Sequence, residues 1–271
     1  MFNFRKLKTI RSLFQIKSID LRMSKVVLFK SESDGPDKFV EELQKHNFTV
    51  QSITSIDFCF KNLELLSDKL NKFDDYEGIV FTSPRSIIAT QKSTDNKIFE
   101  KWNDKEFNYT VGESTGKLAA DLLNLSTKGQ DAGNALKLSS IIVNDFTAQS
   151  ATRPLLFPCG NLKQDILGKN LSEHSIKLDA VEVYDTIPHP NLEERVRRLK
   201  DEDSQFFVFF SPSSIKFSLP FINKHQLDLA CINFIAIGPS TKKCLIDNNL
   251  TCYGMCEKPS PESLLNVLFL Q

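Results

Sequence analysis

The first thing this sequence lacks is a net charge. Its 34 Lys and Arg residues are balanced by 34 Asp and Glu residues. Proteins that bind nucleic acid usually carry a basic excess or patch, so the balance argues against that class. No apolar run approaches the roughly 18 residues that suggest a transmembrane helix, so we expect no membrane span. Apolar residues make up 41% of the chain and charged residues 25%, as in globular proteins that bury a sizeable core.

Potential metal ligands are few and scattered. The chain has six cysteines and four histidines, and the closest two cysteines lie in CYGMC (252–256) without forming a CxxC. Zinc sites need ligands in clusters of defined spacing, so we expect no metal site. Unpaired thiols are the normal state of an intracellular protein, and we expect a cytoplasmic location.

Three common functional motifs are also missing. The sequence contains no GxxxxGK[ST], no GxGxxG and no GxSxG. These absences argue against a P-loop, a dinucleotide-binding turn and the nucleophile elbow of an α/β-hydrolase.

The first 23 residues differ from the rest of the chain. They hold six Lys or Arg residues but one acidic residue, Asp20, and apolar side chains recur at helical spacing. This composition is typical of a mitochondrial transit segment. The alternative is an unstructured extension, with Met23 as a second possible start. The segment is therefore left out of the fold prediction.

One unit of sequence occurs twice. IVFTSPRSI (79–87) is echoed by VFFSPSSI (208–215), and YTVGESTGKLA (109–119) by FIAIGPSTKKCL (234–245). The two Ser-Pro turns are 128 residues apart and the two glycine turns 126. A period of this length suggests a duplicated domain, although α/β proteins also reuse strand–turn–helix units without duplication.

Strand and helix patterns alternate along the chain from about residue 24. This alternation predicts an α/β fold with parallel sheets. The prolines of IPHP and the polar stretch near Asp57–Asn62 divide the chain into two domains. We expect domain A to hold 24–57 and 188–271, and domain B to hold 58–187 with hinge strands at its ends. Two similar lobes joined by a two-stranded connection would enclose an active cleft.

Several local predictions are specific enough to check. Pro36 is expected in the first turn of a helix. A strand over 49–58 is expected to run into a linker. The segment after LLFPCG is expected to form a helix that buries Leu162, Ile166 and Leu171.

The repeated turns have the chemistry of anion sites. Each leads from a strand into a helix N-terminus rich in Ser, Thr and Gly, and FPCGNLK (157–163) adds a fifth such turn. Free N–H groups and the helix dipole make such termini suitable for anions. Several of them around one cleft suggest a ligand with several negative groups. The alternative is that the hydroxyls only cap their own helices.

Tyr184, in VEVYDT, is the most distinctive single side chain. It lies near the end of a strand that enters the hinge, where its phenol can donate or accept a hydrogen bond. It is a candidate weak general acid, or else an amphipathic residue at a domain boundary.

These segments together resemble the uroporphyrinogen-III synthase family, in particular its animal type. The resemblance covers residue 24 to the end, and its most specific parts are LLFPCGNLK and GNALKL. It implies a reaction without a cofactor. The implied substrate is hydroxymethylbilane, a linear tetrapyrrole with eight carboxylates. The implied reaction is loss of water, inversion of ring D through a spiro-pyrrolenine, and closure to uroporphyrinogen III in heme biosynthesis. A monomer is also implied, with a possible hand-off of substrate from hydroxymethylbilane synthase.

The resemblance carries roles to individual positions. Tyr184 matches the candidate acid for hydroxyl loss. The expected substrate-binding residues, from this match and from the turns themselves, are Ser83, Arg85, Thr115, Gly160, Lys163, Ser211, Ser213, Ser240 and Thr241. Glu113 departs from an anion-binding turn because it places a negative charge there.

Two function classes follow from this sequence. The first is the synthase, in which holding the bilane folded supplies much of the catalysis. We expect no single substitution to abolish its turnover and Tyr184→Phe to reduce turnover most. The second is a two-lobe binding protein that closes on an anionic metabolite without chemistry.

Overall fold

The chain forms two compact units. The computed structural model describes residues 25–32, 35–95, 97–162, 166–199 and 205–269. Unit 1 takes the described residues up to Asp57 and those from Pro188 onward, and unit 2 takes Phe58–Ile187. The expected extension at 1–23 lies outside the described residues, as does Lys163.

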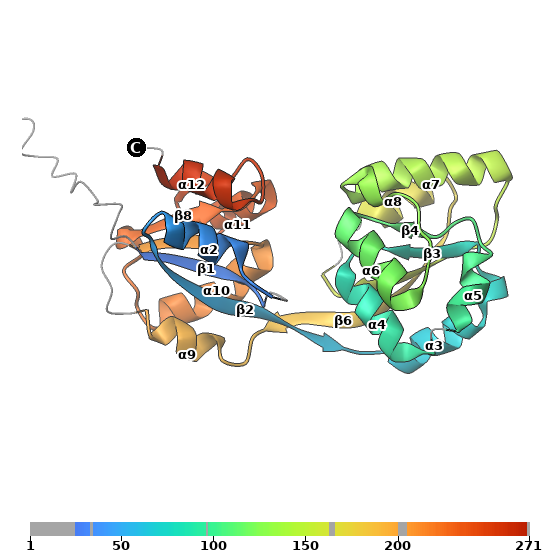
Figure 1. Cartoon of the computed structure of the whole chain (residues 1–271), viewed down its shortest axis with the longest axis horizontal. Coiled ribbons are helices and arrows are strands. Elements are labelled where there is room, and N and C mark those ends of the chain that lie inside the picture. Colours follow the sequence, from blue (N-terminus) through green and yellow to red (C-terminus); the bar gives the residue numbers. More distant parts are fainter. Residues whose placement is uncertain (1–24, 33–34, 96, 163–165, 200–204, 270–271) are drawn as a thin grey trace, which may run out of the picture. The chain divides into compact units, whose positions relative to one another are not determined.

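Unit 1 is a parallel sheet covered by helices on both faces (Figure 1). Its strand order is β2–β1–β7–β8–β9, with parallel pairing throughout. The strands are β1 (Lys25–Ser31), β2 (Thr49–Phe60), β7 (Gln205–Phe209), β8 (Ile232–Ala236) and β9 (Cys252–Met255). The helices are α2 (Lys38–Lys45), α9 (Leu192–Arg197), α10 (Pro212–Lys224), η4 (Leu229–Cys231), α11 (Pro239–Asp247) and α12 (Pro261–Phe269).

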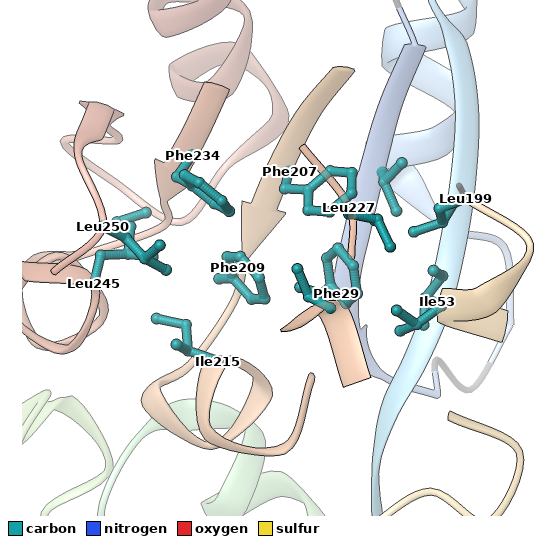
Figure 2. Packing of buried hydrophobic residues seen from close by; sticks show 14 of the residues in the cluster. Phe29, Ile53, Leu199, Phe207, Phe209, Ile215, Leu227, Phe234, Leu245 and Leu250 are labelled. Carbon is teal, nitrogen blue, oxygen red and sulfur yellow. The ribbon is translucent and has the colours of Figure 1, made fainter. Parts of the chain in front are cut away.

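In unit 1, alternate side chains of the same strands pack into two hydrophobic layers. Phe29, Phe207 and Phe209 point to the face covered by α9, α10 and α11 (Figure 2). Their neighbours Leu28 and Val208 point to the other face, which α2 and α12 cover. A strand buried on both faces reads as a continuous apolar run, which is why VVLF shows no alternation.

Unit 2 has the same architecture with its strands in a different chain order. The sheet order is β4–β3–β5–β6, and the pairs β4–β3, β3–β5 and β5–β6 are parallel. The strands are β3 (Gly78–Phe81), β4 (Tyr109–Thr110), β5 (Leu155–Gly160) and β6 (Leu178–Pro188). The helices are α3 (Leu63–Asn71), η2 (Phe73–Asp75), α4 (Pro84–Ser93), α5 (Ile98–Asn103), α6 (Glu113–Leu123), η3 (Gln130–Ala132), α7 (Ala135–Gln149) and α8 (Ile166–Glu173).

Helices again cover both faces of this sheet. One layer contains Ile79 and Phe81 with the apolar faces of α3, α4, α5 and α6. The other contains Val80 and Phe157 with α7 and α8. Beyond β4, Lys128 forms a parallel bridge to Tyr109, in the place that a fifth strand takes in unit 1.

The two sheets share one irregularity. In unit 1 the pairing of β1 with β2 shifts between Lys30 and Ser31, so that Ser31 faces Ile56. In unit 2 the pairing of β5 with β6 shifts between Cys159 and Gly160, so that Gly160 faces Tyr184. A matching shift at matching strand ends supports duplication of one domain, and it makes Ile56 the counterpart of Tyr184.

Three local predictions are wrong in detail. Helix α2 begins at Lys38, because the carboxylate of Asp37 accepts the Phe39 N–H at 3.1 Å and caps it, so Pro36 precedes the helix. Strand β2 extends two residues beyond its expected end, to Phe60, because contact with β6 persists at Lys61, whose N–H donates to the Val183 carbonyl at 3.0 Å.

The third wrong prediction concerns the residues that α8 buries. Leu162 and Ile166 are 52% and 40% exposed, and the helix buries Leu167 with Leu171. The sequence pattern could not show where the helix begins, and the starting point decides which residues face the sheet.

Candidate active site

The sheet order of each unit defines one switch point. In a doubly wound sheet, ligands bind beyond the carboxyl ends of the strands where the order reverses. This point falls between β1 and β7 in unit 1 and between β5 and β3 in unit 2. Ser211 follows β7, Ser83 follows β3, and Gly160 ends β5. Three of the expected site residues therefore lie where the topology favours a ligand.

The two Ser-Pro turns are built alike. Ser83 Oγ accepts the N–H of Arg85 at 3.1 Å and caps α4, and Ser211 Oγ accepts the N–H of Ser214 at 3.2 Å and caps α10. Ser86 Oγ donates to the Ser83 carbonyl at 2.7 Å, as Ser214 Oγ donates to the Ser211 carbonyl at 2.6 Å. Each turn thus has its serine fixed as a helix cap, which is the structural alternative considered for these hydroxyls.

The two glycine turns begin α6 and α11. Gly112 and Gly238 stand at their N-caps, so each helix starts without a capping side chain. Thr115 and Thr241 are both 2% exposed. Ser240 is exposed and Ser213 is half-buried.

Backbone hydrogen bonds anchor these turns to the preceding strands. The Val111 N–H donates to the Phe81 carbonyl at 3.0 Å, and the Ile237 N–H donates to the Phe209 carbonyl at 3.1 Å. Glu113 is exposed to solvent in the first turn of α6, where a negative charge is favourable.

Tyr184 is the centre of a small cluster within unit 2. Its phenol donates to Ser83 Oγ at 3.0 Å. Its ring lies against Gly160, where an added Cβ would be 2.5 Å from the Tyr184 Cζ. Phe58 meets the ring edge-on, with centroids 5.8 Å apart, and the Arg85 guanidinium lies 4.5 Å from the centre of the Phe58 ring. Four elements, β6, β5, β2 and the start of α4, therefore fix the phenol.

Burial favours the neutral form of this phenol. Tyr184 is 9% exposed, and burial raises its pKa above the ordinary value of 10, while the hydrogen bond to Ser83 and the charge of Arg85 oppose the rise. The phenol is therefore neutral at pH 7 and is able to donate its proton.

The sequence did not single out two residues that shape the cluster. Asn161 ties the turn after β5 to β6, because its N–H donates to the Tyr184 carbonyl at 3.1 Å and its Oδ1 accepts the Thr186 N–H at 2.9 Å. Asn161 lies in the motif LLFPCGNLK, so the sequence contained a signal that could have identified it. Phe58 is one of 22 phenylalanines and carries no signal in the sequence.

Within the described ranges, no three His, Cys, Asp or Glu side chains gather closely enough to hold a metal ion. None of the helices in the described part of the chain combines the length and apolar character that a bilayer span needs.

The fold and the site together define a class of protein. It is a two-unit, doubly wound α/β protein whose candidate site consists of hydrogen-bond donors at helix N-termini and one neutral, buried phenol. A model of the family described as Uroporphyrinogen-III synthase HemD matches residues 16–266. The chain belongs to the uroporphyrinogen-III synthase family.

Relatives and solved structures agree with this assignment. Uroporphyrinogen-III synthase of Saccharomyces cerevisiae is 28% identical over 267 residues, covering 91% of this chain and 96% of the relative. The same enzyme of Schizosaccharomyces pombe is 28% identical over 248 residues, covering 89% and 95%.

Two solved structures share the fold. The crystal structure of uroporphyrinogen-III synthetase from Helicobacter pylori gives a TM-score of 0.64 at 18% identity, covering 90% of this chain and 98% of that one. A mutant uroporphyrinogen III synthase from Thermus thermophilus gives a TM-score of 0.56 at 15% identity, covering 90% and 96%. By its family the chain is an enzyme of heme biosynthesis, a lyase that acts on a tetrapyrrole.

Proposed function

We propose that this enzyme closes hydroxymethylbilane to uroporphyrinogen III with the groups found at its two switch points. The terminal hydroxyl of the bilane leaves as water. The resulting azafulvene attacks ring D at its substituted carbon and forms a spiro-pyrrolenine. Fragmentation and reclosure then invert ring D. Without such control the linear substrate closes to the uninverted isomer I.

The observation that supports this proposal is the placement of Tyr184. A neutral phenol on β6 is held next to the switch point of unit 2 by a hydrogen bond to Ser83 at 3.0 Å. Departure of a hydroxyl requires a proton, and a positioned acid of this kind contributes typically 10²–10⁴-fold to a rate. The three other phenols among the described residues have different surroundings. Tyr76 and Tyr109 donate to Asp179 and Asp145, and the Tyr253 ring packs against Phe206.

The turns are proposed to bind the carboxylates of the substrate. Helix N-termini present unsatisfied N–H groups and a partial positive charge to anions. Arg85 adds a guanidinium that can take a carboxylate through two parallel bonds. The proposed binding residues are Ser83, Arg85, Thr115, Gly160, Lys163, Ser211, Ser213, Ser240 and Thr241, of which Lys163 lies outside the described residues.

The location, the oligomeric state and the substrate supply of the enzyme are part of the same proposal. We place the enzyme in the cytoplasm as a monomer, and the hydroxymethylbilane comes from hydroxymethylbilane synthase by direct hand-off or by diffusion. A mitochondrial location is the alternative, supported by the basic composition of residues 1–23. A binding protein without chemistry is not favoured, because the match to the synthase family extends over residues 16–266.

A product assay tests the proposed function. Hydroxymethylbilane is generated in situ, purified protein is added, and the oxidised products are separated into isomers I and III. We expect isomer III well above the level formed without enzyme. Isomer I alone, from folded protein, would contradict the proposal and leave the binding protein as the explanation.

Tyr184→Phe tests the acid within this assay. We expect kcat to fall by about 10²-fold with a small change in KM, because the ring keeps its packing and the proton donor is lost. Tyr76→Phe is the matched control, since it removes a phenol that donates to Asp179 in the same unit and is expected to leave kcat unchanged. A wild-type kcat in Tyr184→Phe would exclude the acid role.

A further inference from the structure

Tyr184 and Ser83 differ in their exposure to solvent. Tyr184 is 9% exposed, with its ring enclosed by Gly160 and Phe58. Ser83 is half-buried at the start of α4, beyond the end of β3. At the switch point the serine is therefore more accessible to a substrate than the tyrosine is.

The hydrogen bonds around Ser83 orient its own proton. Ser83 Oγ accepts from the Tyr184 phenol at 3.0 Å and from the Arg85 N–H at 3.1 Å. A hydroxyl has two acceptor sites and one donor. Both acceptor sites are thus occupied, and no acceptor for the Ser83 proton is found in the described part of the chain. That O–H is therefore free to donate to a ligand bound at this turn.

We propose that Ser83 is the group that protonates the leaving hydroxyl, with Tyr184 behind it as the proton source. This inference rests on the proposed function. The Ser83 proton passes to the leaving oxygen as the Tyr184 proton passes to Ser83 Oγ. The C–O bond breaks, and its electron pair leaves with the oxygen as water. The pyrrole nitrogen lone pair forms a C=N bond, and ring electrons form the exocyclic C=C bond of the azafulvenium cation.

The proton balance closes at the end of the reaction. Ring D loses the hydrogen of its free α-carbon as a proton when it becomes aromatic again. That proton returns through Ser83 to the Tyr184 phenolate. The Arg85 guanidinium, held over Phe58 at 4.5 Å, favours the transient phenolate. The net change is the loss of one water, and no other reactant is consumed.

The transfer of a proton from Tyr184 through Ser83 is called the relay below. Unit 1 shows that the relay is not a general property of the repeated turn. Ser211 caps α10 as Ser83 caps α4, but the position that corresponds to Tyr184 is Ile56. An isoleucine has no proton to supply. The relay is therefore confined to unit 2, and Ser211 is left with capping and binding.

A double-mutant cycle tests the relay. Ser83→Ala, Tyr184→Phe and the double variant are compared by single-turnover rate in the product assay. We expect both single variants to lose about 10²-fold and the double variant to lose no more than the worse of the two, because each breaks the same chain. Ser83→Thr is expected to recover most of the rate, since it keeps the hydroxyl and its extended backbone (φ −154°, ψ 139°) suits a β-branched residue.

Two controls separate the effect of losing the relay from the effect of losing the N-cap of α4. Asn134→Ala removes the N-cap of α7 in the same unit, so its thermal unfolding gives the cost of a lost cap, and its turnover should stay near wild type. Ser83→Gly repeats the test with a residue that caps nearly as well as serine, in case the alanine variant does not fold.

Three results would overturn the relay. These are a near wild-type rate in Ser83→Ala, losses that multiply in the double variant, and no recovery in Ser83→Thr. Each of these leaves isomer III as the product of the wild-type enzyme. Isomer I alone from the wild type would instead remove the proposed function, and the relay with it, so the two failures are distinguishable.

Discussion

Gly160 shapes the site because it has no side chain. Gly160 ends β5, and the Tyr184 ring occupies the space where a Cβ would stand. An ideal Cβ there would lie 2.5 Å from Cζ, 2.6 Å from Cε2 and 2.8 Å from the phenolic oxygen. Its role is thus to admit the ring, in addition to any contact of its backbone with substrate.

Gly160→Ala is expected to displace the Tyr184 ring. The free energy of unfolding should fall by about 1–3 kcal/mol, the usual cost of overpacking. Turnover should fall as well, because the hydrogen bond to Ser83 depends on the ring position. Urea unfolding and single-turnover assays measure the two effects.

The matched control is the same substitution in a Tyr184→Ala background. There the added methyl group meets open space, so Gly160→Ala should have little effect on stability. Equal losses in both backgrounds would show that the ring is not what the glycine accommodates.

At the scale of elements, strand starts and strand ends are held by different means. At the carboxyl ends, serine caps join β3 to α4 and β7 to α10. At the amino ends of β3 and β5, an ion pair joins the strands. Glu77 Oε1 accepts the N–H groups of Thr152 and Arg153 at 3.2 Å and 3.1 Å, and Glu77 Oε2 accepts Arg153 Nη2 at 2.9 Å.

This ion pair predicts a pH dependence of stability. The Arg153 side chain, with the two N–H groups, holds the pKa of the Glu77 carboxyl below its ordinary value against the effect of burial. A lowered folded-state pKa stabilises the fold above the ordinary pKa, and the benefit is lost as the pH falls through the folded value. Glu77→Gln should therefore lower the free energy of unfolding by about 1 kcal/mol at pH 7 and by less near pH 3.

Denaturant unfolding at the two pH values measures the difference. Glu194→Gln serves as the control, because Glu194 pairs with Arg197 and Arg198 on the surface, where ion pairs contribute little. A difference between wild type and Glu77→Gln that is as large at pH 3 as at pH 7 would contradict the assignment.

At the scale of the whole molecule, the chain interleaves its two units. Unit 2 is continuous over Phe58–Ile187, while unit 1 combines the segments before and after it. In unit 1, β1 lies between β2 and β7, so the sheet needs strands from both segments. The single tryptophan, Trp102, is buried in unit 2, and its fluorescence reports on that unit alone.

Fragments should behave accordingly. We expect residues 58–187 to unfold cooperatively in urea when expressed alone, because their two hydrophobic layers are complete. Residues 188–271 should show no cooperative transition by circular dichroism, because they lack β1 and β2. A fragment of 58–187 without a transition would mean that unit 2 depends on unit 1 for its stability.

The sequence by itself determined the α/β class, the repeated strand–turn–helix units and the family. These are local or cumulative properties: apolar runs, capping residues and motif order do not depend on distant contacts. The Ser-Pro turns could be placed at helix starts for the same reason, since the serine, the proline and the bonded N–H groups lie within four residues.

The tertiary structure alone decided what those turns contact. Ser83 and Tyr184 are 101 residues apart in the chain, and their hydrogen bond depends on β5 lying between β3 and β6. The role of Gly160 depends on the pairing shift before it, and that of Phe58 on β2 lying next to β6 in the sheet. Such contacts follow from strand order and register, which the packing of the whole sheet fixes and no short stretch of sequence encodes.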